Sequence, residues 1–187
     1  RFLLQTILML CDGTICVSKA VFDGNRFYLD RLFSRKHRVV IYNGVDHSAI
    51  ASHSNSDFRK DHAISSGAKV VGFVGDLKPV KDLPTLVRGF SKIEDNEAVL
   101  LIVGGGALSN EIAKLCQQLG LQNRVHMIGM VERAAVYCAL KEIDVFVLPS
   151  LVEGLSEALA QAMSASLPVV CSDIAPNREL ITHGENG

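Results

Sequence analysis

The sequence predicts an α/β fold in which a Rossmann-like parallel sheet carries helices on both faces. From residue 69 onward, short apolar runs alternate with helical segments. The runs are apolar throughout, which is typical of strands that are buried on both faces of a parallel sheet. Successive runs are separated by one helix each, as right-handed crossovers between parallel strands require.

The composition is that of an ordinary globular protein. The 187 residues are 48% hydrophobic and 21% charged, with a formal net charge of −1. We expect no nucleic-acid partner, because there is no basic excess. The apolar stretch at 2–11 is too short for a membrane span and lacks the charged start and cleavage site of a signal peptide. The five cysteines have no metal or disulfide spacing, which favours a cytoplasmic location.

Residues 1–46 are expected to form the end of a first, α/β domain, of which only a remnant is present. The expected elements are the tail of a helix at 1–10, strands at 13–17 and 39–42, and a helix from an N-cap at Ser18 to about residue 33. Residues 47–68 are polar and serine-rich, so we expect a linker with one short helix near 57–62. The chain starts at Arg1 and stops at a turn signal, and we therefore interpret it as a fragment.

Residues 69–187 carry the regular pattern and are expected to form a second domain, truncated at its C-terminus. The expected strands are at 70–74, 98–103, 125–128, 144–148 and 168–171. The expected helices are at 83–93, 109–119, 132–140 and 156–164, and a last one begins near Pro176 and runs to about residue 182.

Two glycine-containing loops follow strands of this domain. Gly75 lets the backbone turn close to a ligand, and Lys78 and Lys81 can place ammonium groups near a diphosphate. The alternative is a turn whose lysines are merely solvated. The glycines at 104–106 indicate a tight strand-to-helix turn, because Ser109 replaces the last glycine of a dinucleotide fingerprint and no acidic residue follows about 20 residues later.

The stretch at 153–170 places a carboxylate in front of a capped helix. Ser156 is the expected N-cap, and the N–H groups of Glu157 and Ala158 point out of the carboxyl edge of the sheet, where α/β proteins bind anions. Glu153 lies in the preceding turn and can accept hydrogen bonds from sugar hydroxyls. The alternative is that both glutamates only complement the helix dipole. The stretch therefore predicts half of a sugar-nucleotide site.

Three segments carry a resemblance to a known family: VGFVGDLKPVKDLPTLVRGF, LLIVGGGALSNEIAKLCQQLGLQNRVHMIGMV and DVFVLPSLVEGLSEALAQAMSASLPVVCSDIAPNRELITHGENG. In order and spacing they resemble the C-terminal half of a glycosyltransferase of family 4, which has the two-domain GT-B fold. The resemblance implies a retaining enzyme that moves a sugar from a nucleotide diphosphate sugar without a metal or other cofactor. It implies that the N-terminal domain binds the acceptor, which is a lipid, a polysaccharide or a small molecule.

The resemblance also implies roles for individual residues. Lys81 would neutralise the donor diphosphate, and Glu153 would contact the donor hexose. The helix start from Ser156 to Ala158 would face the phosphates. The backbone around Met130 and Val131 would contact the base. The second domain would then be the nucleotide-sugar-binding domain.

Two positions depart from the family's pattern. Gln161 stands where the family has a glutamate that contacts the ribose, and Asp76 stands where it has an arginine, with Lys78 as the nearest replacement cation. These departures leave open a non-catalytic binding or scaffold module, and a GT-B epimerase acting on a nucleotide sugar is a further alternative. We expect the chain alone to bind the donor weakly and to turn over little or nothing. A peripheral membrane association through the missing half is left open.

Overall fold

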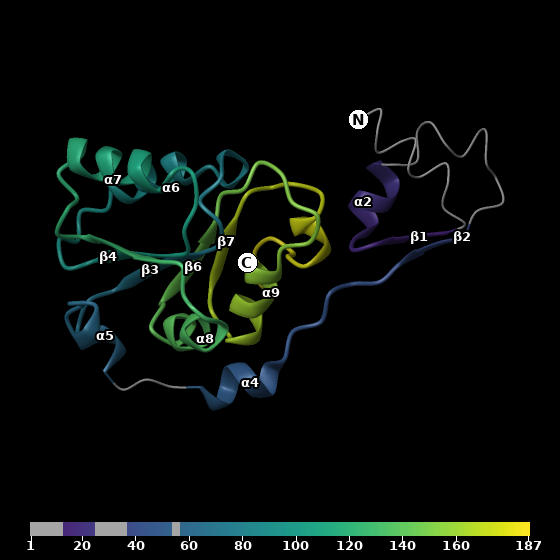
Figure 1. Cartoon of the computed structure of the whole chain (residues 1–187), viewed down its shortest axis with the longest axis horizontal. Helices are drawn as coiled ribbons and strands as arrows, with labels where there is room; N and C mark the ends of the chain where they lie inside the picture. The colour runs from purple at the N-terminus through teal and green to yellow at the C-terminus, as the bar shows by residue number, and fades with distance from the viewer. Residues whose placement is uncertain (1–12, 25–36, 54–56) are drawn as a thin grey trace.

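The computed structural model describes residues 13–24, 37–53 and 57–187. It confirms the predicted α/β fold, because a five-stranded parallel sheet carries helices on both faces (Figure 1). The expected helix at 1–10 and the part of the next helix beyond residue 24 lie outside the described residues.

The five-stranded sheet has the order β5-β4-β3-β6-β7, with every neighbouring pair parallel. Its strands are β3 (Val70–Val74), β4 (Val99–Val103), β5 (Val125–Gly129), β6 (Val145–Leu148) and β7 (Val169–Cys171). All five residues of β4 are buried, as its uniformly apolar sequence predicts. The winding direction reverses between β3 and β6. An open α/β sheet has a ligand-binding crevice at such a reversal, outside the carboxyl ends of the strands.

Four helices cover the two faces of this sheet: α6 (Leu83–Phe90), α7 (Ser109–Gln118), α8 (Arg133–Lys141) and α9 (Glu157–Ser164). Helices α6 and α7 lie on one face, and α8 and α9 lie on the other (Figure 1). Helix α6 shows why these segments are helical, because its buried residues Leu83, Leu86, Val87 and Phe90 follow the helical period. No helix in the described ranges is both long and apolar enough to cross a membrane.

The prediction of a last helix from Pro176 to about residue 182 was wrong in the length and type of the helix. Only a short 3-10 helix, η2 (Asn177–Glu179), forms after Pro176. Gly184 adopts a left-handed conformation with φ of +76°, and the N–H of Glu185 bonds back to the carbonyl of Thr182. The chain thus turns at Thr182, where the helix was expected to end.

The N-terminal elements are β1 (Gly13–Cys16), α2 (Lys19–Gly24) and β2 (His37–Val40), and the two strands pair in parallel. Ser18 is the predicted N-cap of α2, since its Oγ accepts a hydrogen bond from Val21 N at 3.1 Å. Strand β2 begins and ends two residues earlier than predicted. Pairing with β1 sets these bounds, because Gly13 pairs with His37 and Cys16 pairs with Val40.

The described parts of the segment at 47–68 contain two short helices, α4 (His47–Ser52) and α5 (Phe58–Asp61). Only the second was expected, because Ile50 is the only large apolar residue of α4. Both Ile50 and Phe58 are buried in the main hydrophobic core. The segment therefore packs against the second domain, and the expected domain boundaries stay a prediction.

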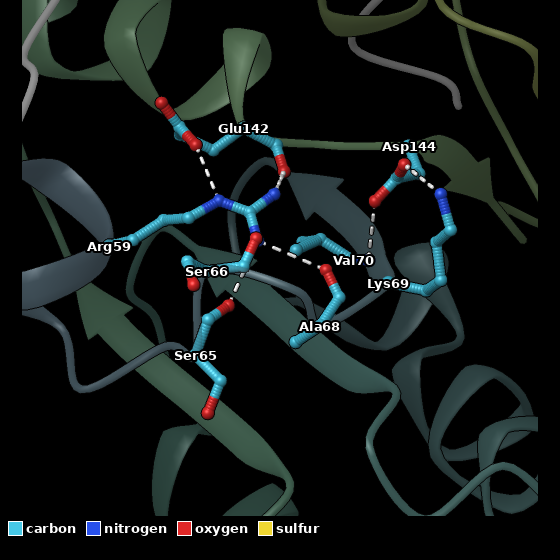
Figure 2. Close-up of polar contacts among 8 residues, drawn as sticks. All are labelled: Arg59, Ser65, Ser66, Ala68, Lys69, Val70, Glu142 and Asp144. Atoms are coloured by element: carbon cyan, nitrogen blue, oxygen red, sulfur yellow. Dashed lines mark hydrogen bonds and ion pairs between the residues drawn. The ribbon is translucent and has the colours of Figure 1, made fainter.

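Arg59 of α5 ties this segment to the sheet (Figure 2). Its Nε donates to Glu142 Oε2 at 2.7 Å, and its guanidinium also donates to the backbone carbonyls of Ala68 and Glu142 at 3.0 and 3.2 Å. Close by, Asp144 Oδ2 accepts from Val70 N at 2.8 Å. These bonds join the chain entering β3 to the chain entering β6. They therefore fix the two strands between which the winding reverses.

Candidate functional site

A pocket of about 440 Å³ opens at the carboxyl ends of β3 and β6, where the winding of the sheet reverses. Its walls come from the segments that follow β3, β5 and β6. Most of the residues that the sequence singled out line it together: Gly75, Lys81, Val131, Glu153, Ser156, Glu157, Ala158 and Gln161. Side chains from distant parts of the sequence thus meet at the predicted edge of the sheet.

An ion pair between Lys81 and Glu153 forms one wall of the pocket. Lys81 ends the 3-10 helix η1 (Pro79–Lys81), and its Nζ lies 2.6 Å from Glu153 Oε1. The two side chains are only 18% and 9% exposed, respectively. Leu151 N donates to the carbonyl of Val80 at 2.8 Å, which joins the loops that carry the pair. The pair is therefore held in place by the backbone on both sides.

The N-terminus of α9 forms a second wall. Ser156 is buried and extended, and its Oγ accepts a hydrogen bond from Leu159 N at 3.3 Å, so the predicted N-cap is confirmed. The first N–H groups of a helix have no partner within the helix. Those of Glu157 and Ala158 belong to residues that line the pocket. An anion in the pocket would meet these N–H groups and the positive end of the helix dipole.

Gln161 and Glu157 lie one turn apart on α9 and are hydrogen bonded. Gln161 Nε2 donates to Glu157 Oε1 at 3.0 Å, and Gln161 is only 7% exposed. The same carboxylate oxygen lies 3.8 Å from an Nη2 nitrogen of Arg133, the first residue of α8. Sequence reasoning missed Arg133. It could have been found by the argument used for Glu157, because both residues begin a helix after the carboxyl end of a strand.

Lys78 and Met130 do not line the pocket, although both were expected at the site. Lys78 Nζ lies 2.5 Å from Asp76 Oδ2, and both side chains are about 60% exposed. The hydrogen bond from Lys78 lowers the pKa of Asp76, so the carboxylate that replaces the expected arginine engages the lysine beside it. Met130 is 85% exposed.

The glycines after β4 bring the loop after β4 into contact with the loop after β3, which carries Gly75 of the pocket. Gly104 has φ of +130°, and a Cβ at this position would lie 2.0 Å from the carbonyl oxygen of Gly75. Leu77 N donates to the carbonyl of Gly105 at 3.0 Å. The glycine run therefore lets the chain after β4 support the loop after β3, which agrees with the interpretation as a tight turn.

Within the described ranges, no cluster of three or more His, Cys, Asp or Glu side chains could hold a metal ion. The described cysteines, Cys16, Cys116, Cys138 and Cys171, are free thiols.

Known proteins resemble this chain in sequence. A 153-residue stretch is 33% identical to an uncharacterized glycosyltransferase of Methanocaldococcus jannaschii and covers 79% of the chain and 39% of that protein. A 156-residue stretch is 35% identical to a UDP-Gal:alpha-D-GlcNAc-diphosphoundecaprenol alpha-1,3-galactosyltransferase of Escherichia coli and covers 79% of the chain and 40% of that protein. The chain thus spans about two fifths of the length of these curated relatives.

Solved structures share the fold. HepE from Anabaena, solved in complex with UDP and glucose, matches with a TM-score of 0.84 at 23% identity, over 98% of this chain and 52% of that one. The model of the glycosyl transferases group 1 family matches residues 54–187, which include every wall of the pocket. The chain therefore belongs to the family described as glycosyl transferases group 1.

Proposed function

We propose that this chain forms the donor half of the active site of a retaining, metal-independent glycosyltransferase of family 4. The whole enzyme would transfer a sugar from a nucleotide diphosphate sugar to an acceptor held by the N-terminal domain. The observation that carries the proposal is the joining of Lys81, Glu153 and the α9 N-terminus in one pocket at the reversal of the sheet. Side by side, these groups offer a cation, a carboxylate that can accept hydrogen bonds from hydroxyl groups, and an anion-binding helix end.

The chemistry follows from where charge develops. When the bond between sugar and phosphate breaks, negative charge builds on the leaving diphosphate. The ammonium of Lys81 and the N–H groups at the start of α9 are fixed in advance and stabilise that charge, which is the most effective form of electrostatic catalysis. Glu153, held by Lys81, accepts hydrogen bonds from hydroxyls of the donor hexose.

Two relatives guide the choice of donor. HepE was solved with UDP and glucose, and the Escherichia coli relative is named for UDP-Gal. A UDP-hexose is therefore the first donor to test for this chain. The acceptor is proposed to bind the N-terminal half. The chain on its own is then expected to bind nucleotide weakly and to transfer little or no sugar.

Calorimetry with UDP and GDP tests the donor site. We expect binding of one nucleotide, and we expect Lys81→Ala to weaken it about tenfold or more, since a charge-assisted contact to phosphate is lost. Lys114→Ala is the matched control, because Lys114 is an exposed lysine of α7 that does not line the pocket. If neither UDP nor GDP binds, the result would count against a donor site and in favour of a scaffold role.

A further inference from the structure

Two ion pairs among the residues that line the pocket differ in length and in exposure. Lys81 and Glu153 are 2.6 Å apart and mostly withdrawn from water. Arg133 and Glu157 are 3.8 Å apart, with side chains that are 73% and 52% exposed. A short pair removed from water is costly to break, whereas a long, solvated pair contributes little. The guanidinium of Arg133 is therefore the cation of this pocket that can change partner at low cost.

Arg133 also lies next to the anion-binding end of α9. Its guanidinium faces Glu157, which is the first residue of that helix. A phosphate group bound by the N–H groups at the start of α9 would thus lie within reach of the guanidinium. The planar fork of an arginine matches two phosphate oxygens at once, which a lysine cannot do.

Gln161 and Arg133 both face the carboxylate of Glu157. The amide of Gln161 donates to Glu157 Oε1, the same oxygen that faces Arg133. This bond directs the carboxylate towards Gln161, which lies one turn further along α9. Because Gln161 already provides this carboxylate with a hydrogen bond, Glu157 keeps a partner when Arg133 turns to another anion.

Lys78 is poorly suited to the same task. It is paired with Asp76 at 2.5 Å and does not line the pocket. We infer that Arg133, together with Lys81, binds the diphosphate of the donor, so that the second cation comes from the start of α8 and not from the loop after β3. This inference rests on the proposed function.

The test compares nucleotides with one and two phosphates. Affinities for UDP and UMP are measured by calorimetry on the 187-residue chain, or for GDP and GMP if only guanine nucleotides bind. We expect Arg133→Ala to weaken binding of the diphosphate about tenfold or more and binding of the monophosphate much less. The ratio of the diphosphate affinity to the monophosphate affinity should therefore fall. The affinity ratio of Arg133→Lys should lie between those of wild type and Arg133→Ala, because lysine keeps the charge but lacks the planar fork of the guanidinium.

Arg88→Ala is the matched control, because Arg88 is an exposed arginine of α6 that does not line the pocket, and its affinities should stay within about twofold of wild type. Lys78→Ala tests the rival cation. An unchanged affinity ratio in Arg133→Ala, an equal loss for both nucleotides, or a larger loss in Lys78→Ala would overturn the assignment of Arg133. If the unaltered chain binds no nucleotide, the proposed function fails and this inference fails with it.

Discussion

Lys81 Nζ and Glu153 Oε1 lie 2.6 Å apart and bridge the loops that follow β3 and β6. These strands are neighbours in the sheet, although the two residues are 72 positions apart in the chain. The ammonium and the carboxylate proposed for the donor site therefore neutralise each other in the absence of a donor. The donor diphosphate and Glu153 would then compete for the same ammonium.

Replacement of Glu153 tests this competition. Glu153→Gln leaves the mostly buried ammonium of Lys81 without a charged partner, so the free energy of unfolding should fall by about 1–3 kcal/mol. UDP should restore part of that loss, because its phosphates give Lys81 a new partner. Urea denaturation with and without UDP measures both effects. Glu157→Gln, which removes the more exposed acid of the pocket, should change stability by only about 0.5 kcal/mol. Equal losses of stability in Glu153→Gln and Glu157→Gln would contradict the proposed competition for Lys81.

Gln161→Glu should introduce a repulsion that depends on pH. The new carboxylate would face Glu157 Oε1 at the place where Gln161 Nε2 now donates at 3.0 Å. Two like charges at this distance raise the pKa of one carboxyl group in the folded state. A raised pKa favours the folded state as the pH falls, so the loss relative to wild type, about 1 kcal/mol at pH 7, should shrink towards pH 5.

Denaturation curves at several pH values measure this effect. The double variant Glu157→Gln/Gln161→Glu is the matched control, since it exchanges the acid and the amide and restores one hydrogen bond between them. A loss in the single variant that is the same at every pH would argue against the repulsion.

Glu179 should make the attachment of the N-terminal elements sensitive to acid. Its carboxylate accepts hydrogen bonds from Lys19 N at 2.8 Å, Ala20 N at 2.6 Å and the Tyr42 hydroxyl at 2.8 Å. Burial opposes the ionised form, but these bonds outweigh it and lower the pKa of Glu179 from its usual value of 4.5. A lowered pKa gives stability that is present above pH 4.5 and is lost as the pH falls through the folded-state value.

The variant Glu179→Gln should therefore be less stable than wild type above pH 4.5, and the difference should vanish in more acidic solution. Denaturation between pH 7 and pH 3 measures it, with hydrogen exchange at Lys19 and Ala20 as a local readout. Glu94→Gln, in an exposed loop, is the control. A constant difference across this range would show that ionisation of Glu179 does not contribute.

Gly104→Ala should damage the support beneath the pocket. The new Cβ would lie 2.0 Å from the carbonyl oxygen of Gly75, and the backbone φ of +130° is unfavourable for alanine. We expect a loss of about 2 kcal/mol or more, measured by denaturation. Gly89→Ala is the matched control, because Gly89 lies in α6 with open space around it, and alanine there should stabilise by about 0.5–1 kcal/mol.

Local patterns were sufficient to predict the strands and most of the helices of the second domain. The apolar runs at 70–74 and 98–103 became β3 and β4 with almost the predicted bounds, because a strand buried on both faces needs a continuous apolar sequence. The caps at Ser18 and Ser156 were also predictable, because N-cap hydrogen bonds reach only three residues along the chain. Helix α4 was missed because Ile50 is its only large apolar residue and packs into a core that distant elements form.

The sequence by itself determined the α/β alternation, the capped helix after Glu153 and the chemical types of residue at the carboxyl edge of the sheet. These follow from hydrophobic period and from contacts between near neighbours in the chain. The strand order, the pairing of Lys81 with Glu153, the exclusion of Lys78 from the pocket and the presence of Arg133 in it were decided only by the tertiary structure. The physical reason is that side-chain charges interact through space, and the packing of the sheet sets which distant loops meet.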